Sequence, residues 1–134
     1  MAPGRAAVGA AAVHEERPAG VGRERIGGRR HPEIEDVAIV RVEQLYPWPK
    51  ETIGKELSRY RNAEVVWCQE EPANMGYWTF VDRRLEFALE GIDIKAKRPF
   101  YAGRMPAAAP ATGLMRTHTK EQNQVIEWAL AKPL

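Results

Sequence analysis

The sequence predicts an α/β fold, in which a mostly parallel sheet is flanked by helices in three layers. Segments of strand-like composition alternate with segments of helical periodicity, in the order strand, helix, strand, helix, strand, helix. The 134 residues give room for one domain. Because sheets of this kind usually have about five strands, three predicted strands lead us to expect that the fold is incomplete at its N-terminal side.

The first predicted strand covers residues 37–42, a nearly continuous run of Val, Ala and Ile that suits burial on both faces of a parallel sheet. Pro49 then favours the start of a helix, because its missing N–H costs nothing at the first helical position. Gly54 weakens this helix by roughly 1 kcal/mol relative to alanine. The apolar face of the helix is predicted to contain Ile53, Leu57 and Tyr60.

The second strand is predicted at residues 64–69 and ends before Pro72. Asn74 is a candidate N-cap for the helix that follows. Gly91 is a suitable residue for the C-terminal end of that helix. One face of the helix is predicted to bury Trp78, Val81, Leu85 and Ala88.

A third, short strand is predicted at residues 100–103, and Pro99 before it indicates an edge position. Residues 105–113 are predicted to form a loop. Thr119 and Gln122 have the spacing of a capping box, which predicts that the last helix begins there. Its inward residues are predicted to be Val125, Ile126, Ala129 and Leu130.

The N-terminal part of the chain differs in composition from the rest. Residues 1–32 hold six of the eleven glycines and six arginines, but no aromatic residue. Ala and Gly bury too little area to offset the entropy of ordering the backbone. We therefore divide the chain into a disordered or mistranslated tail, residues 1–35, and a folded domain, residues 36–134. A secretory signal, a transit peptide and an Arg/Gly nucleic-acid tail are less favoured, because the segment has a weak apolar core, three glutamates and no serine.

Overall composition excludes several classes of protein. A net charge of +2 is too small to predict binding to nucleic acid or to a membrane surface. The longest apolar run, residues 6–13, is much shorter than the ~20 residues of a membrane helix. Cys68 is the one cysteine, so no internal disulfide can form.

Polar residues near the second strand do not form a complete catalytic set. Glu70 and Glu71 lie at the edge where open α/β sheets bind ligands, yet adjacent strand residues point to opposite faces and cannot form an acid–base pair. Cys68 is interpreted as an apolar filler rather than a nucleophile paired with His118. We therefore assign no catalytic, cofactor-binding or metal-binding residue.

Three arginines could hold an anionic group, since a guanidinium group can bind a phosphate or a carboxylate through two parallel hydrogen bonds. They are Arg59, Arg61 and Arg104. The competing interpretation is that these three arginines are scattered over the surface and solvated. The Pro-Ala-Thr-Gly segment at residues 110–113 lacks the glycine spacing and the lysine of a phosphate loop.

Longer motifs resemble a known family. They are VRVEQLYP at 40–47, NAEVVWCQEEPANMG at 62–76, YAGR at 101–104, APATG at 109–113, and His118 with Glu121-Gln122. In this order they resemble the C-terminal domain of the thiamine-dependent decarboxylase component of the 2-oxoglutarate dehydrogenase complex, over about residues 36–131. The segment WCQEEP followed by NMG separates this family from the related pyruvate and branched-chain enzymes and from transketolase.

The resemblance implies a transketolase C-terminal-like α/β domain that pairs subunits and supports the active-site domains of a citric acid cycle enzyme. The family decarboxylates 2-oxoglutarate on thiamine diphosphate with magnesium, bound in two preceding domains, so we expect neither to bind here. The implied partners are the rest of the decarboxylase chain, a second subunit, the succinyltransferase and dihydrolipoyl dehydrogenase. The implied location is the bacterial cytoplasm, or the mitochondrial matrix in a eukaryote. Some members bind a regulatory nucleotide such as acetyl-CoA, for which Arg59 and Arg61 are the candidates here.

The N-terminal segment departs from the family pattern. In the family, the strand before Val37 is an apolar run ending in Cys-Ser-Gly-Lys and followed by a helix, and residues 1–32 show neither. The Ala, Gly, Arg and Pro bias is typical of out-of-frame translation of G+C-rich DNA. Our hypothesis is a gene fragment or frameshift product, inactive alone, and poorly soluble or oligomeric because a sheet edge is bared. The alternative is a free-standing interaction or regulatory module that binds a partner or an acetyl-CoA-type nucleotide through residues 70–76 and 104–113.

Overall fold

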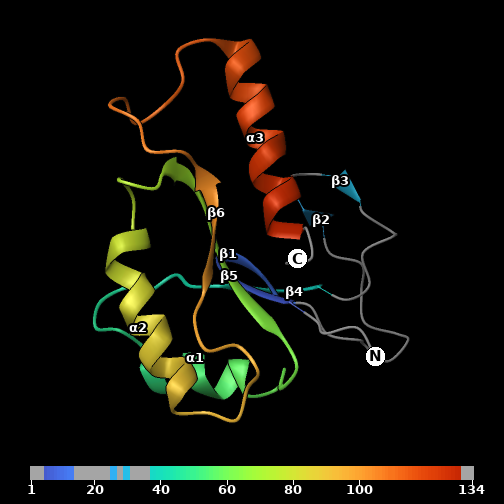
Figure 1. Ribbon diagram of the computed structural model, residues 1–134, viewed down its shortest axis with the longest axis vertical. Coiled ribbons are helices and arrows are strands. Elements are labelled where there is room, and N and C mark those ends of the chain that lie inside the picture. Colours follow the sequence, from blue (N-terminus) through green and yellow to red (C-terminus); the bar gives the residue numbers. More distant parts are fainter. Residues whose placement is uncertain (1–4, 14–24, 27–28, 31–36, 131–134) are drawn as a thin grey trace.

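The computed structural model describes the backbone of residues 5–13, 25–26 and 29–30 and the whole of residues 37–130. These ranges contain a four-stranded sheet, a two-stranded sheet and three helices (Figure 1). Within them, no helix combines the length and the apolar character needed to cross a membrane. The elements are β1 (Arg5–Val13), β2 (Arg25–Ile26), β3 (Arg29–Arg30), β4 (Val37–Arg41), α1 (Lys50–Leu57), β5 (Glu64–Pro72), α2 (Trp78–Glu90), β6 (Phe100–Arg104) and α3 (Met115–Leu130).

The main sheet has four strands in the order β4-β1-β5-β6, and every neighbouring pair is parallel. β2 and β3 form a separate antiparallel pair. The predicted α/β class, the parallel sheet and the alternation of β4, α1, β5, α2, β6 and α3 are thereby confirmed.

Helices cover both faces of the sheet. Gln69 of β5 accepts a hydrogen bond from the backbone of Trp78 in α2, whereas the next residue, Glu70, accepts one from Gln122 in α3. Since adjacent strand residues point to opposite faces, α2 and α3 lie on opposite sides of β5. α1 packs beside α2, while α3 crosses β6, β5 and β1, which gives three layers (Figure 1).

β1 lies between β4 and β5, in a segment that the sequence predicts to be part of a disordered tail. Its pairing with Val37–Arg41 is regular from Arg5 to Gly9 and shifts repeatedly after Gly9. Composition alone favours disorder here because Ala and Gly have low strand propensity, but two neighbouring strands supply hydrogen bonds on both sides. The sheet has one strand more than predicted, so the expectation of a missing first strand is not confirmed. The short pair β2 and β3 also lies in the predicted tail. The other residues of the tail lie outside the described residues, and the division of the chain at residue 35 stays a prediction.

The core forms where α1 and α2 meet the sheet. Val65, Leu57 and Leu85 are fully buried there, and burying an aliphatic side chain of this size contributes about 1.5–3 kcal/mol. The predicted inward positions of α1 and α2 are buried as expected, apart from Trp78, which is half-buried and packs on the Tyr101 ring at a centroid distance of 5.2 Å.

Two predicted helix starts are wrong. Asn74 does not cap α2, whose N-cap is Tyr77, because its side chain binds the backbone of Ala107 instead. α3 begins at Met115, and the hydroxyl of Thr119 donates to the Met115 carbonyl at 3.0 Å from within the helix. Both errors arise because short polar side chains bind whichever backbone group lies nearest in the folded chain.

Candidate functional site

Most residues of the motifs singled out above gather at the carboxyl edge of β5 and β6. β5 ends at Pro72 and β6 ends at Arg104, and the first half of α3 lies beside these ends (Figure 1). This is the edge at which open α/β sheets bind their ligands. This edge is therefore the candidate site.

Gln69 fixes the turn between β5 and α2. Its side chain is 8% exposed. The amide oxygen accepts hydrogen bonds from Nε1 of Trp67 at 2.9 Å and from the backbone N–H of Trp78 at 3.0 Å. The amide nitrogen donates to the carbonyls of Pro72 at 3.1 Å and Met75 at 2.8 Å. Gln69 is thus fully engaged in holding the chain and has no hydrogen-bonding capacity left for a ligand.

A glycine is required next to this amide. Gly76 has φ of +64°, a backbone conformation that residues with a side chain rarely adopt. A Cβ at this position would lie 3.1 Å from Nε2 of Gln69 and 3.1 Å from the side chain of Glu71. The glycine of the Asn-Met-Gly part of the motif is therefore needed for the conformation of the turn between β5 and α2.

Arg104 carries a buried positive charge at the end of β6. Its side chain is 8% exposed. Nη2 lies 3.1 Å from Nδ1 of His118, and because guanidinium groups only donate, that nitrogen is the acceptor. Nε lies 3.5 Å from the carboxylate of Glu121. The hydroxyl of Thr112 donates to the same carboxylate. The YAGR, APATG and His-Glu-Gln motifs therefore meet in one polar cluster.

Asn74 ties the loop after β6 to the loop after β5. Its Nδ2 donates to the carbonyl of Ala107 at 2.9 Å, and its Oδ1 accepts from the N–H of Ala107 at 3.0 Å. The backbone N–H of Ala73 also donates to the carbonyl of Arg104 at 3.0 Å. Together with the Thr112–Glu121 contact, these bonds hold residues 105–114 at both ends and near their middle.

Cys68 and Glu70 lie on the face covered by α3. Nε2 of Gln122 donates to Glu70 at 3.0 Å. Burial, with a smaller contribution from the charge of Glu70, raises the pKa of the Cys68 thiol to about 11. Since the thiolate is the nucleophilic form, this environment is unfavourable for a nucleophile at neutral pH. His118 contacts Arg104.

The two predicted regulatory arginines lie at the opposite edge, before the amino end of β5. Arg59 is exposed and donates to Glu56 at 2.9 Å, and Arg61 is exposed and pairs with Asp93. Arg104 lies at the carboxyl edge, so the three arginines considered together above are not brought to one place. A regulatory anion at Arg59 and Arg61 stays a prediction.

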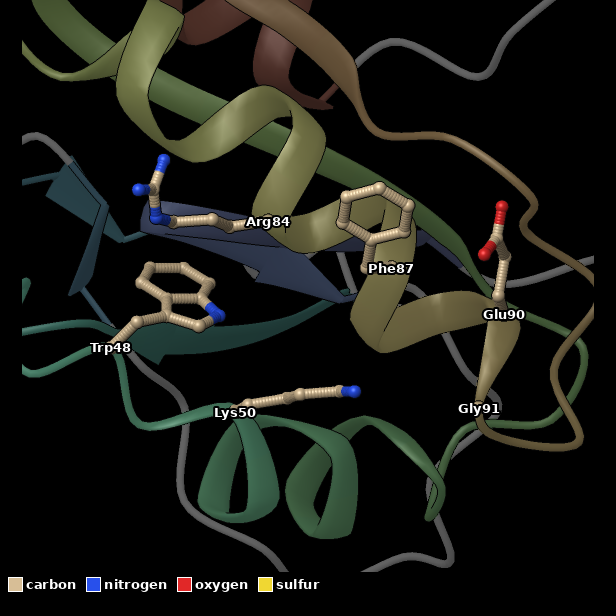
Figure 2. Close-up of a pocket in the computed structure, with 6 residues that line it drawn as sticks. All are labelled: Trp48, Lys50, Arg84, Phe87, Glu90 and Gly91. Carbon is tan, nitrogen blue, oxygen red and sulfur yellow. The ribbon is translucent and has the colours of Figure 1, made fainter.

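A pocket that the sequence does not predict lies between α1 and α2 (Figure 2). Its volume is about 400 Å³. Arg84 and Lys50 flank Trp48, whose buried Nε1 has no hydrogen-bond partner among the described residues. Its residues come from the loop before α1, the first residue of α1 and the C-terminal part of α2, so no sequence motif marks them. They are Trp48, Lys50, Arg84, Phe87, Glu90 and Gly91.

No three His, Cys, Asp or Glu side chains come close enough to hold a metal ion in the part of the chain that the structure describes. Two carboxylates of the candidate site have partners within the domain: Glu70 accepts from Gln122, and Glu121 accepts from Thr112 and faces Arg104.

Comparison with known proteins gives one consistent result. A sequence model of the family described as "2-oxoglutarate dehydrogenase C-terminal" matches residues 25–130. Curated relatives include the "2-oxoglutarate dehydrogenase E1 component" of Brucella anthropi, Brucella ovis and Brucella canis, each 56% identical over 97 residues. The match covers 72% of this chain and 10% of each relative, so the chain spans about a tenth of the length of these proteins.

Proposed function

Because this chain belongs to the 2-oxoglutarate dehydrogenase C-terminal family, we propose that it acts as the C-terminal domain of a thiamine-dependent 2-oxoglutarate decarboxylase. Its role there is structural: it supports the active-site domains and helps to pair subunits, and it has no activity alone. Thiamine diphosphate and magnesium bind to the other domains of such an enzyme.

The internal pairing of the motif residues supports this role. Gln69 binds the backbone of Pro72 and Trp78. Arg104 contacts His118 and Glu121, and Glu121 also accepts a hydrogen bond from Thr112. A catalytic site needs groups that are free to meet a substrate, whereas a scaffold needs groups that fix the chain. The polar groups named here fix the chain, as a scaffold requires.

The proposed partners are the remainder of the decarboxylase chain, a second decarboxylase subunit, the succinyltransferase and dihydrolipoyl dehydrogenase. The proposed location is the bacterial cytoplasm, since the relatives named above are bacterial. The interaction with the remainder of the chain is the one that a direct experiment can address first.

Complementation tests the proposed function. The Brucella anthropi relative is expressed without the C-terminal tenth that this chain matches, and this chain is expressed beside it. We expect neither part to decarboxylate 2-oxoglutarate alone and the two together to regain activity. A folded chain that restores nothing would refute the proposal. Binding of acetyl-CoA by the chain alone would instead favour the free-standing regulatory module.

A further inference from the structure

One exposed segment has a composition unlike an ordinary surface loop. Residues 105–115, called the 105–115 segment below, contain no charged residue and consist mainly of Ala, Pro, Met and Leu. Residues 105–111 are all exposed. Met105 is 68% exposed, Leu114 71% and Met115 77%. Contiguous exposed apolar surface is a common feature of interaction sites.

The 105–115 segment is also held in one conformation. Asn74 binds both backbone groups of Ala107, and Thr112 binds Glu121. The contact between Arg104 and His118 brings the two ends of the segment together, because Met105 follows Arg104 and His118 donates its backbone N–H to the Leu114 carbonyl. Met105 and Leu114 are therefore held near the contact between His118 and the buried Arg104. Preformed surfaces lose less entropy on binding than flexible ones.

We infer that the 105–115 segment is a preformed docking surface for the polypeptide that precedes this domain in its longer relatives. The inference rests on the proposed function and adds to it the surface through which the domain attaches. The surface of that polypeptide which contacts the 105–115 segment is apolar and uncharged, because the segment itself is apolar and uncharged.

The absence of charge in the 105–115 segment favours a covalently linked partner over a diffusing one. Diffusing partners use charged rims to raise their rate of encounter and to reject wrong surfaces. A domain joined to its partner by the chain is already at an effective concentration in the millimolar range. The relatives are about ten times as long as the matched segment, since it covers 10% of each. The partner surface is therefore sought in those relatives.

Hydrogen exchange in a fused protein tests the inference. The C-terminal tenth of the Brucella anthropi relative is replaced by this chain, and amide exchange of residues 105–115 is compared between the fusion and the free chain. We expect exchange at least tenfold slower in the fusion. The variant with Met105→Glu and Leu114→Glu is expected to lose this protection and most decarboxylase activity, while the free variant melts within a few degrees of the parent.

A matched control and three outcomes separate the hypotheses. Phe87→Glu changes another large apolar side chain, 56% exposed on α2, and should leave the exchange of the 105–115 segment slow. An active fusion in which the segment exchanges as fast as in the free chain would overturn the inference and leave the proposed function standing. An inactive fusion in which this folded domain does not associate would overturn both. An equal loss of protection in Phe87→Glu would assign the docking to a different or much larger surface.

Discussion

At the scale of single residues, Gln69 shows how a polar group acquires a structural role inside a sheet. It is the buried polar residue of β5, and it binds groups from the strand, the turn and α2. The sequence does not predict this role, because no local pattern distinguishes a structural glutamine from any other polar residue of a strand. Its importance follows from the hydrogen bonds of its side-chain amide, whose partners are brought together by the folded turn.

Replacing Gln69 by leucine is expected to destabilise the fold. Nε1 of Trp67 and the N–H of Trp78 would lose their acceptor, and each buried donor without a partner costs about 1–3 kcal/mol. We expect a loss of about 2–4 kcal/mol in the free energy of unfolding, measured by urea denaturation. Gln124→Leu changes an exposed glutamine of α3 and should alter stability by less than about 0.5 kcal/mol. Equal effects would contradict the assigned role.

Cys68 is expected to react slowly with alkylating reagents. With a pKa of about 11, the thiol is ~0.1% ionised at pH 8, against roughly a quarter for an ordinary thiol of pKa ~8.5. Iodoacetamide should therefore modify the native protein about a hundredfold more slowly than the urea-unfolded protein. Rapid labelling near neutral pH would instead support a catalytic thiolate.

The same shift links Cys68 to the pH dependence of stability. The folded-state pKa of the Cys68 thiol lies above its unfolded-state pKa. Its contribution to the free energy of unfolding is therefore complete below the unfolded-state pKa and declines as the pH rises toward 11. Cys68→Ser should remove this decline between about pH 9 and 11, as followed by thermal melting.

At the scale of elements, the existence and order of strands and helices follow from the sequence, while their connections do not. The run at 37–42 and the periodicity of 78–90 predict β4 and α2 because burial patterns are local properties of the chain. Asn74 binds Ala107, a partner 33 residues away. No local pattern encodes such a partner, so its role in the site could not be predicted.

Removing the Asn74 side chain tests whether it holds the loop. Asn74→Ala deletes both bonds to Ala107, and because the site is exposed, the global stability should fall by no more than about 1 kcal/mol. Hydrogen exchange at the amide of Ala107 should become markedly faster. Asn123→Ala, at an exposed position of α3, is the control and should leave that amide unchanged. Unchanged exchange in Asn74→Ala would show that other contacts fix the loop.

At the scale of the whole molecule, β1 decides how the sheet is connected. It is the strand that joins β4 to β5, and it comes from a segment whose composition predicts disorder. The structure therefore differs from the sequence expectation at the centre of the sheet. Alanine and glycine carry little information about burial, so a strand made of them is recognised by its neighbours rather than by its own pattern.

A proline at Ala7 distinguishes a central strand from a disordered tail. Ala7 pairs with Ile39 on one side and Val66 on the other. Proline removes the N–H that a central strand needs. Because the partner carbonyl is left unpaired, Ala7→Pro should cost about 1–3 kcal/mol, measured by thermal melting. Ala7→Val keeps the N–H and should have a much smaller effect. If Ala7→Pro melts as the parent does, residues 5–13 do not contribute to the folded sheet.

The position of β1 also bears on how the chain folds during synthesis. β1 is made first, yet its neighbour β5 is made only after β4 and α1 have been added, at ~5–20 residues per second. Its hydrogen-bonding groups therefore remain open to other nascent chains for seconds. A segment of strong β-branched residues would aggregate in that interval, whereas Ala and Gly have little tendency to pair alone. The composition that conceals this strand in the sequence is the one that lets it remain unpaired until its partner is made.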